Sequence, residues 1–367
     1  MFRAFCSAFV LLSLLAPLSV VQARPVIFDT DMAIDDWLAL LYLAQHPQAE
    51  LKAVTISASG EAHCAPSKVN VANLLALTNS REQTVIACGD DVPLDGYFTF
   101  PKAWRDDADT LSGIELHKAP AGRFPVSNQH AADVIHSVIN ESSEATDIVA
   151  VGPLTNIAQW LQRYPQDKTK AGRLFIMGGN WQVKGNIIVP LFTKDHPNTN
   201  AEWNIFIDPL AADQVLQSGL DIVMVGLDVT NQVRVTHAYA DQFKTRVKTP
   251  AAAFTDQVLD KNRWFIDSNE YYYWDVLTAI IAMDNSLCTP QQQAFAVDHR
   301  IAGKEPYLKT SDLSMPDKRW DGQPRSHLDA GYAGHLIAKN EGPTVSYCMK
   351  TSAEKAFESF TSVINLP

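Results

Sequence analysis

Short apolar runs and amphipathic stretches alternate along most of this 367-residue chain. Pro25 to Phe28 is an apolar run of strand length, and the residues from Asp35 to Gln45 place their apolar side chains at helical spacing. The same pattern predicts strands at Leu51 to Ser57, Thr84 to Cys88, Asp147 to Val151, Arg173 to Met177 and Asp221 to Leu227, and helices at Val69 to Leu77, from Thr155 onward and at Asp208 to Ser218. This alternation predicts an α/β fold with a mostly parallel, doubly wound (Rossmann-like) sheet and helices on both faces.

The first 23 residues have the pattern of a cleaved signal peptide. Arg3 precedes the apolar stretch from Ala8 to Val21, and Val21-Gln22-Ala23 offers small residues at cleavage spacing. An uncleaved membrane anchor is the alternative, but this stretch is short for a span of about 20 residues. We expect a single α/β domain at residues 24–367, exported to the periplasm or secreted. No repeat, low-complexity tract or linker divides it.

Charge narrows the set of partners. Removing residues 1–23 lowers the number of basic residues from 30 to 29 and leaves all 41 acidic residues, so the net charge becomes -12. Such a charge argues against a nucleic acid or an anionic membrane surface as partner. It suits a soluble protein with a small-molecule substrate, and a bound cation would offset part of the negative charge.

Four cysteines remain after cleavage, and none belongs to a CxxC pair, which argues against a zinc or redox motif. Four cysteines allow three pairings. We favour Cys64 with Cys88 and Cys288 with Cys348, because each pair is close in sequence order. Four buried free thiols are the open alternative.

Polar clusters follow several of the predicted strands. They are Asp29 to Asp36, Ser59 to His63, Gly152 to Asn156 and Met177 to Asn180. Ligands of open parallel sheets bind at the carboxyl ends of the strands, so the site is expected there. The first cluster holds four aspartates, more than are needed to charge a helix start. Crowded carboxylates suit a hard divalent cation such as calcium, although the pattern is not an EF-hand loop.

The aspartate cluster DTDMAIDD resembles the DTDPGIDD signature of the inosine-uridine-preferring nucleoside hydrolases, which are nucleoside N-ribohydrolases. Four further blocks resemble this family in the same order along the chain, up to about residue 285. They are VGPLTNIA (Val151 to Ala158), IMGG (Ile176 to Gly179), AEWNIFIDP (Ala201 to Pro209) and YWDVLTA (Tyr273 to Ala279).

This resemblance implies a calcium site and a ribose pocket for a nucleoside substrate. The implied calcium ligands are Asp31, Asp36, the backbone carbonyl of Val151, and Asp275. Asp31 would also be the general base, taking a proton from a water whose pKa the calcium lowers. The implied ribose ligands are Asp35, Asn186, Glu202, Asn204 and Asp275, with Met177 packed near the sugar.

The chemistry accounts for these residue types. Cleavage of an N-glycosidic bond develops positive charge on the ribose, which surrounding carboxylates stabilise. Two of the implied ligands, Glu202 and Asn204, are expected on one face of a strand or extended loop. Asp29, at the strand end, is expected to orient the loop. Members of the family are commonly dimers or tetramers, so a homodimer or homotetramer is expected.

The chain differs from part of the family at the residue that contacts the leaving group. Pyrimidine-accepting members have a histidine that protonates the departing base, and Trp274 stands at that position here. The purine-preferring branch also has tryptophan there, and a second one in a segment like FPKAWR, Phe100 to Arg105. We expect Trp104 and Trp274 to stack on a purine. A core or lid aromatic among Tyr97, Phe98 and Phe100 is the alternative for Trp104.

A second departure lies at Ser59 to Cys64, where family members commonly place an Asn or Asp near the ribose. Glu61 could hold a hydroxyl there, and His63 could replace the missing proton donor or be an ordinary loop histidine. From Cys288 onward no catalytic motif is found, and the charge run Asp317-Lys318-Arg319 is typical of a solvated face. That region is expected to complete the sheet edge or a subunit contact.

The leading hypothesis is therefore an exported, calcium-dependent, purine-preferring nucleoside hydrolase. A non-catalytic calcium-dependent nucleoside- or ribose-binding protein is the main alternative, and retention of the base candidate Asp31 argues against it. FDTDMA also resembles the DxDx[TV] motif of haloacid-dehalogenase-like phosphatases. Ala33 stands where that motif needs Thr or Val, which disfavours this interpretation.

Overall fold

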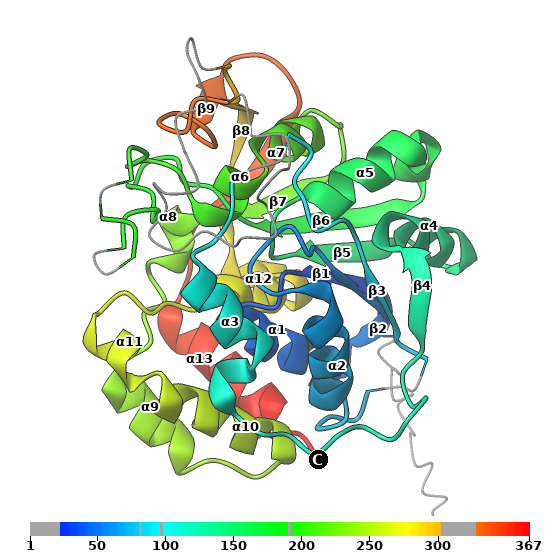
Figure 1. Ribbon diagram of the computed structural model, residues 1–367, viewed down its shortest axis with the longest axis vertical. Helices are drawn as coiled ribbons and strands as arrows, with labels where there is room; N and C mark the ends of the chain where they lie inside the picture. The colour runs from blue at the N-terminus through cyan, green and yellow to red at the C-terminus, as the bar shows by residue number, and fades with distance from the viewer. Residues whose placement is uncertain (1–22, 81–82, 96–97, 190–191, 195, 302–327) are drawn as a thin grey trace, which may run out of the picture.

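The computed structural model describes residues 23–80, 83–95, 98–189, 192–194, 196–301 and 328–367. Within them one sheet has the strand order β4-β3-β2-β1-β5-β6-β7-β10-β8-β9. Its strands are β1 (Arg24–Thr30), β2 (Ala49–Ile56), β3 (Val85–Cys88), β4 (Val126–His130), β5 (Thr146–Ala150), β6 (Ala171–Met177), β7 (Ile222–Val225), β8 (Thr289–Val297), β9 (Leu336–Lys339) and β10 (Thr344–Lys350). Neighbours from β4 to β10 are parallel, whereas β8 is antiparallel to β10 and to β9. The predicted mostly parallel sheet is confirmed (Figure 1).

Helices cover both faces of this sheet. They are α1 (Ile34–Gln45), α2 (Cys64–Leu75), α3 (Lys102–Asp109), α4 (Ala131–Glu141), α5 (Thr155–Arg163), α6 (Trp203–Ile207), α7 (Pro209–Leu216), α8 (Leu227–Thr230), α9 (His237–Lys244), α10 (Pro250–Lys261), α11 (Arg263–Asp267), α12 (Trp274–Met283) and α13 (Ala353–Ile364). Short 3₁₀ turns lie at Leu111–Gly113, Pro165–Thr169 and Asn285–Leu287. On one side α1, α2, α10, α12 and α13 form the larger core, and on the other α4, α5 and α7 form a second one.

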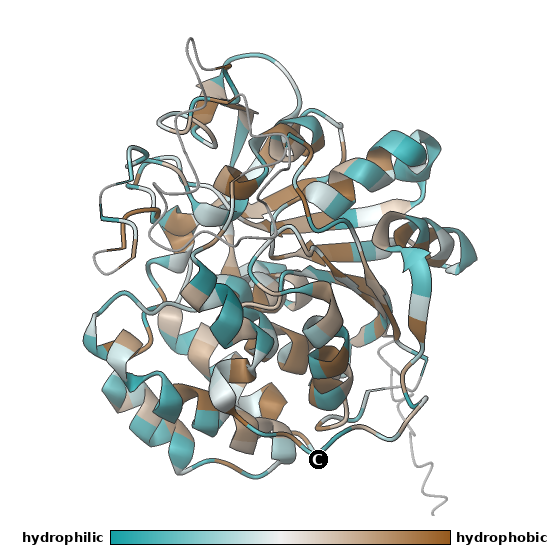
Figure 2. Cartoon of the chain, viewed as in Figure 1, coloured by the Kyte–Doolittle hydropathy of each residue, from teal (hydrophilic) through white to brown (hydrophobic). Residues whose placement is uncertain are grey.

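Burial on both faces explains why the strands are continuous apolar runs in the sequence. The strand residues Val26, Ile27 and Phe28 are all fully buried, because helices cover both faces of β1. Figure 2 shows hydrophobic residues along the sheet and hydrophilic ones on the outer sides of α4 and α5. Among the described helices, none has the length and apolar character needed to span a membrane.

Two predicted elements differ from the structure. Helix α2 begins at Cys64 instead of Val69, since the first turn of a helix tolerates Pro66. The expectation that Glu202 and Asn204 share one face of a strand or extended loop is wrong, because Asn204 lies in helix α6. Glu202 is the N-cap of α6, and its carboxylate accepts hydrogen bonds from the backbone N–H groups of Asn204 and Ile205.

The C-terminal region completes the sheet edge, as expected from the sequence. Strand β10 pairs with β7 on one side and with β8 on the other, and β9 forms the outer edge. Helix α13 then packs against α1, where the hydroxyl of Tyr42 lies 2.9 Å from that of Ser359. The signal segment up to residue 22, Tyr97 and the charge run Asp317-Lys318-Arg319 lie outside the described residues.

Two disulfides join the favoured pairs of cysteines. Cys64, the first residue of α2, is bonded to Cys88 at the end of β3. Cys288, just before β8, is bonded to Cys348 in β10. The predicted pairing is confirmed, and four free thiols are excluded.

Removing either disulfide is expected to lower the free energy of unfolding by about 2–5 kcal/mol. The bonds close loops of different length, with sequence separations of 24 and 60 residues. Loop-closure entropy makes Cys288→Ala/Cys348→Ala the more destabilising double variant by about 0.8 kcal/mol. Urea unfolding of the two double variants and the parent measures this order, and the reverse order would contradict it.

Candidate active site

A cavity of about 1360 Å³ opens at the carboxyl ends of the central strands. Strand order reverses between β1 and β5, and this switch point is where α/β sheets bind ligands. Twelve of the residues singled out from the sequence line this cavity, and Asp29 and His63 do not. The twelve are Asp31, Asp35, Asp36, Glu61, Trp104, Val151, Met177, Asn186, Glu202, Asn204, Trp274 and Asp275. Residues from α1, α3, α6, α11 and α12 thus share one site.

The turn between β1 and α1 is built around Asp36. Its Oδ1 accepts hydrogen bonds from the backbone N–H groups of Asp31 and Met32, both at 3.1 Å, and from the hydroxyl of Thr30. Met32 has φ 60°, a left-handed conformation that is rare for a residue with a side chain. The indole N–H of Trp37 donates to the Met32 carbonyl at 2.7 Å and helps to hold it there. These hydrogen bonds fix the backbone of the turn and with it the positions of Asp31 and Asp36.

Three buried carboxylates meet at the floor of the cavity. Oxygens of Asp35, Asp36 and Asp275 lie within 4.8 Å of one another. Burial and repulsion from Asp36 raise the pKa of Asp35 to about 7, and burial and repulsion from Asp35 raise the pKa of Asp275 well above its usual range. Asp36 Oδ2 is buried and has no hydrogen-bond partner. An all-oxygen donor set with an unpartnered atom fits a hard divalent cation such as calcium.

Asp31 lies beside this trio and is 1% exposed. Its Oδ2 accepts a hydrogen bond from the backbone N–H of Glu61 at 2.9 Å. Burial, and then repulsion from Asp36, raise the pKa of Asp31 well above its usual range. Gly60 and Gly152 pack against it so closely that a Cβ on Gly60 would lie 2.3 Å from Asp31 Oδ2. These glycines leave room for the carboxylate.

Asp29 supports the site from behind. It does not line the cavity, and its Oδ1 accepts hydrogen bonds from the Thr55 hydroxyl at 2.6 Å and the Asn156 amide at 2.8 Å. These bonds join β1 to β2 and α5. Burial raises the pKa of Asp29 to about 7. This placement agrees with the expected orienting role.

The amide and carboxylate side chains on the opposite side of the cavity are also held by hydrogen bonds. Asn204 Nδ2 donates to the Val151 carbonyl at 2.9 Å, so the expected metal-binding carbonyl and an expected ribose ligand contact each other. Asn186 Oδ1 accepts a hydrogen bond from the backbone N–H of Trp203 at 3.1 Å. The carboxylate of Glu202 accepts three backbone N–H bonds, one of them from Gly179 at 2.9 Å. These side chains are fixed before a ligand arrives.

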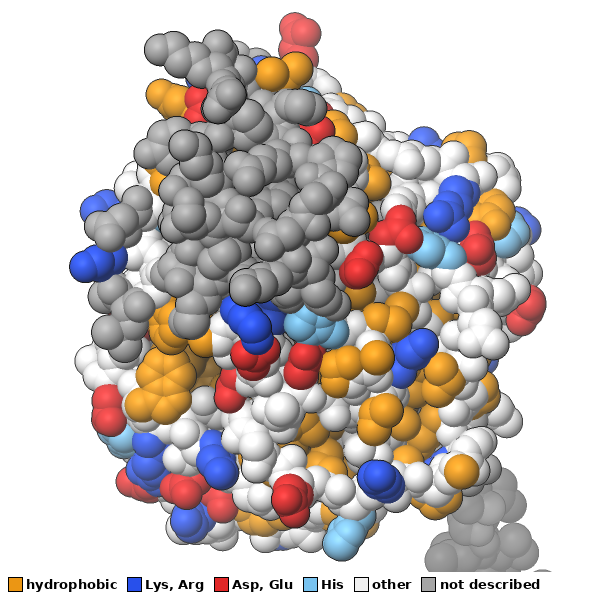
Figure 3. Space-filling view, viewed as in Figure 1, with side chains coloured by type: hydrophobic (Ala, Val, Ile, Leu, Met, Phe, Trp, Pro, Cys, Tyr) orange, Lys and Arg blue, Asp and Glu red, His pale blue; other side chains and the backbone are white. Residues whose placement is uncertain are grey.

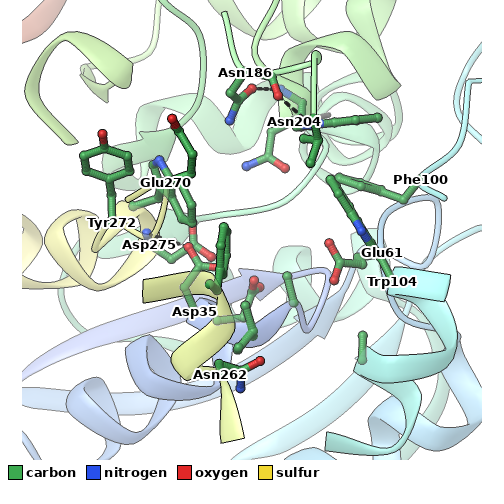
Figure 4. Close-up of a pocket in the computed structure, with 18 of the residues that line it drawn as sticks. Asp35, Glu61, Phe100, Trp104, Asn186, Asn204, Asn262, Glu270, Tyr272 and Asp275 are labelled. Carbon is green, nitrogen blue, oxygen red and sulfur yellow. Dashed lines mark hydrogen bonds between the residues drawn. The ribbon is translucent and has the colours of Figure 1, made fainter. Parts of the chain in front are cut away.

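Two aromatic walls face the cavity (Figure 4). Trp104 packs among Phe100, Phe192 and Trp203, with ring centroids 5.4 Å apart in the Trp104–Trp203 pair. Trp274 packs among Phe265, Tyr271 and Tyr272, and its indole N–H is buried without a hydrogen-bond partner. In Figure 4, Glu61 lies beside Trp104, whereas Glu270, Tyr272 and Asp275 lie across the cavity.

His63, like Asp29, does not line the cavity, and its Nδ1 lies 2.5 Å from Asp109 Oδ2. The backbone N–H of His63 donates to the other oxygen of Asp109 at 2.8 Å, which fixes the start of α2 against the end of α3. We therefore assign His63 no contact with the base.

Several lining residues were not singled out from the sequence, namely Phe192, Phe265, Tyr272, Asp107, Asn262 and Glu270. Repetition of aromatics near Trp274, in the run Tyr271 to Tyr273, was the available signal. Periodicity does not separate an aromatic that lines a pocket from one in the core, and both kinds occur within this run, since Tyr271 and Tyr273 are fully buried.

Similarity to known proteins agrees with this geometry. The family model "Inosine-uridine preferring nucleoside hydrolase" matches residues 26–357. The chain is 32% identical over 255 residues to the pyrimidine-specific ribonucleoside hydrolase RihA of Klebsiella pneumoniae, covering 65% of this chain and 71% of that protein.

Solved structures show the same fold. The inosine-uridine preferring nucleoside hydrolase of Bacillus anthracis has a TM-score of 0.70 at 22% identity and covers 93% of this chain and 99% of its own. The purine-preferring ribonucleoside hydrolase of Gardnerella vaginalis has a TM-score of 0.70 at 22% identity, with 93% and 98% covered. By its family match and its sequence identity to a curated member, the chain belongs to the inosine-uridine preferring nucleoside hydrolases, which act on N-glycosyl bonds.

Proposed function

We propose that this protein is a calcium-dependent hydrolase of purine ribonucleosides, with Asp31 as the general base. The observation that carries the proposal is the position of Asp31, buried at the cavity wall beside the Asp35, Asp36 and Asp275 carboxylates. Asp31, Asp36, Asp275 and the Val151 carbonyl would hold the calcium. When bound, this ion would lower the pKa of the attacking water.

The protein's own residues supply the remaining steps. Asp31 takes the proton of the attacking water, and the fixed bond from Glu61 N–H orients its carboxylate. Asp35, Asn186, Glu202 and Asn204 would bind the ribose, with Met177 packed against it. Since these side chains are already held by hydrogen bonds, little freedom is lost when the sugar binds. The carboxylates stabilise the positive charge that develops on the ribose.

The choice of purines rests on Trp104 and Trp274. Each lies in a separate aromatic wall of the cavity, and together they offer two faces on which a base can stack. The names of similar proteins include both pyrimidine-specific and purine-preferring enzymes, so the tryptophans carry this part of the proposal. An indole N–H is not acidic, so solvent would protonate a neutral purine.

We also propose that the mature chain, from residue 24, acts outside the cytoplasm as a homodimer or homotetramer. The two disulfides support export, because such bonds persist in oxidising compartments. Charges of both signs are interspersed over the face seen in Figure 3, which suits neither a nucleic acid nor an anionic membrane.

Turnover of ribonucleosides by the mature protein tests the proposal. With calcium present, inosine, adenosine or guanosine is expected to give free base and ribose, and uridine is expected to react more slowly. Release from none of the four would overturn the enzyme assignment. Calcium-dependent binding of inosine without turnover, unchanged in Asp31→Asn, would support a binding protein instead.

Replacing Gly60 with Ala is expected to lower kcat for inosine at least about 10-fold, because a misplaced catalytic group loses rate steeply. The new Cβ would meet Asp31 atoms at 2.3 Å, so that side chain must move. Gly331→Ala is the control, since its Cβ would make only an ordinary contact at 3.4 Å with Asp329. Equal rates for both variants would show that Gly60 does not position Asp31.

A further inference from the structure

Three consecutive residues of the loop between β2 and α2 contact the proposed general base. The backbone N–H of Glu61 donates to Asp31 Oδ2 at 2.9 Å, and that of Ala62 donates to the Asp31 carbonyl at 2.8 Å. Gly60 packs against the same side chain, because a Cβ at this position would lie 2.3 Å from Asp31 Oδ2. The position of this loop, residues 57–63, therefore determines the orientation of the Asp31 carboxylate.

Both ends of the loop are tied to Cys88. The backbone of Cys88 pairs with Ile56, the last residue of β2 before the loop begins. The sulfur of Cys88 is bonded to Cys64, which follows the loop as the first residue of α2. The Cys64–Cys88 disulfide thus closes the loop at its base, close in the chain to the Glu61 N–H that holds Asp31.

The other disulfide lies away from this loop. Cys288 precedes β8 and Cys348 lies in β10, in the antiparallel part of the sheet. Among the described residues, none beyond Asp275 lines the cavity. The two bonds also differ in exposure, since Cys64 and Cys88 are both partly exposed, whereas Cys348 is fully buried. A reductant in solution therefore reaches the bond beside the active site more readily.

We propose that the Cys64–Cys88 disulfide is a positioning element of the active site, so that its reduction lowers the rate of base release more than it weakens substrate binding. This inference rests on the proposed hydrolase function. A dithiol transfers two electrons and two protons to the bond, which gives two cysteine thiols and leaves the dithiol as a cyclic disulfide. The loop then loses its covalent closure, and the Asp31 carboxylate is held less firmly. Turnover is therefore highest in an oxidising compartment, where this bond persists.

Paired double variants measure this role. Cys64→Ala/Cys88→Ala is expected to lower kcat for inosine by about 3- to 10-fold, because small misplacements of a catalytic group cost rate steeply. Its KM should change by less than about 2-fold, since the proposed ribose ligands belong to other segments of the chain. Circular dichroism at the assay temperature checks that the variant is folded.

Cys288→Ala/Cys348→Ala is the matched control for this experiment. It is expected to lose more stability than the first variant, because its disulfide closes the longer loop, and yet to keep the kcat of the parent. The order of the two variants in kcat should therefore be the reverse of their order in stability. Equal losses of kcat, or a loss that follows stability, would overturn the proposal.

An Asp31→Asn background separates positioning of the base from general damage to the fold. In a protein without the base, removal of Cys64–Cys88 should leave the residual kcat unchanged, because the loop acts on the rate through Asp31. A further fall of the same size as in the parent would show that the bond supports the fold alone, and it would overturn the proposal.

Stepwise reduction of the parent with dithiothreitol tests the redox dependence directly. Alkylation and peptide mass mapping identify the thiols that appear, and kcat is measured on the same samples. We expect the thiols of Cys64 and Cys88 to appear first, with kcat falling in step and returning after treatment with oxidised glutathione. Full activity of a protein in which only this pair is reduced would overturn the proposal, and so would earlier reduction of Cys288–Cys348.

The failure of this inference differs from the failure of the proposed function. If the oxidised parent is active and its kcat does not depend on Cys64–Cys88, the positioning role is wrong and the hydrolase assignment stands. If the oxidised parent releases no base from inosine, adenosine, guanosine or uridine, both proposals are overturned together.

Discussion

Asp31→Asn is expected to lower kcat for inosine by about 10²- to 10⁴-fold, the range that removal of a general base usually produces. An asparagine oxygen can still accept the hydrogen bond from Glu61 N–H, so the loop should keep its place. The amide cannot take a proton from water. Stability should not suffer, because burial and neighbouring carboxylates disfavour the charged form of Asp31 in the calcium-free protein.

Steady-state rates of base release measure the loss, and circular dichroism checks the fold. Asp221→Asn serves as the control, since Asp221 pairs with Arg173 on the surface and its side chain is 62% exposed. A surface pair of this kind contributes little to stability. If Asp31→Asn retains activity within tenfold of the parent, another group must activate the water.

Calcium is expected to raise the melting temperature by about 5–10 °C at pH 7.5 and by much less at pH 5. An ion at about 100 times its Kd adds about 2.7 kcal/mol to the free energy of unfolding. In a protein of this size each kcal/mol corresponds to about 2–4 °C. The trio of Asp35, Asp36 and Asp275 gains most from a cation when its carboxylates are ionised.

The sign of the pH effect follows from pKa values that are raised in the folded state. Asp29 and Asp35 have pKa values of about 7 when folded and about 3.8 when unfolded. The folded state therefore holds more protons between pH 4 and 7, and its stability falls as pH rises through that interval. Without calcium the protein should be more stable at pH 5 than at pH 7.5. Calcium must compete with those protons, so its effect shrinks as pH falls.

Thermal unfolding with EDTA, with calcium and with magnesium, at several pH values from 5 to 8, tests this expectation. Magnesium is the control, because it demands near-ideal octahedral geometry and releases its water reluctantly. A melting temperature that calcium leaves unchanged at pH 7.5 would contradict a calcium site at these carboxylates. If the rise in melting temperature caused by calcium does not vary with pH, calcium binding is not coupled to the protonation of these carboxylates.

The parallel sheet could be predicted because each of its buried strands is visible in the sequence as an apolar run. Residues such as Val26 to Phe28 are apolar without interruption, and strands of this kind alternate with helices along the chain. The location of the site followed from the polar residues after each strand, and the family resemblance supplied the residues within it. Twelve of those residues then proved to line one cavity, which periodicity alone would not have shown.

What the sequence could not provide was contact between distant segments. His63 was a candidate proton donor because it lies near Glu61 in the chain, but a pair with Asp109, 46 residues away, holds it outside the cavity. Glu202 and Asn204 were expected on one face of a strand or extended loop, but Asn204 lies in α6 and the carboxylate of Glu202 accepts hydrogen bonds from the free N–H groups at the start of that helix. Both outcomes depend on partners that local patterns do not specify, and for His63 the structure decides between the two alternatives that the sequence left open.

Strand β10 has a consequence for the way the chain folds. It lies between β7 and β8, so β8 is joined to the rest of the sheet only through residues 344–350. Asp35 and Asp275, two carboxylates at the floor of the cavity, are likewise 240 positions apart and meet through α1 and α12. Long-range pairing of this kind slows folding. Until β10 docks, the edge of β7 remains open to other chains, so refolding at high protein concentration should favour aggregation over the native state.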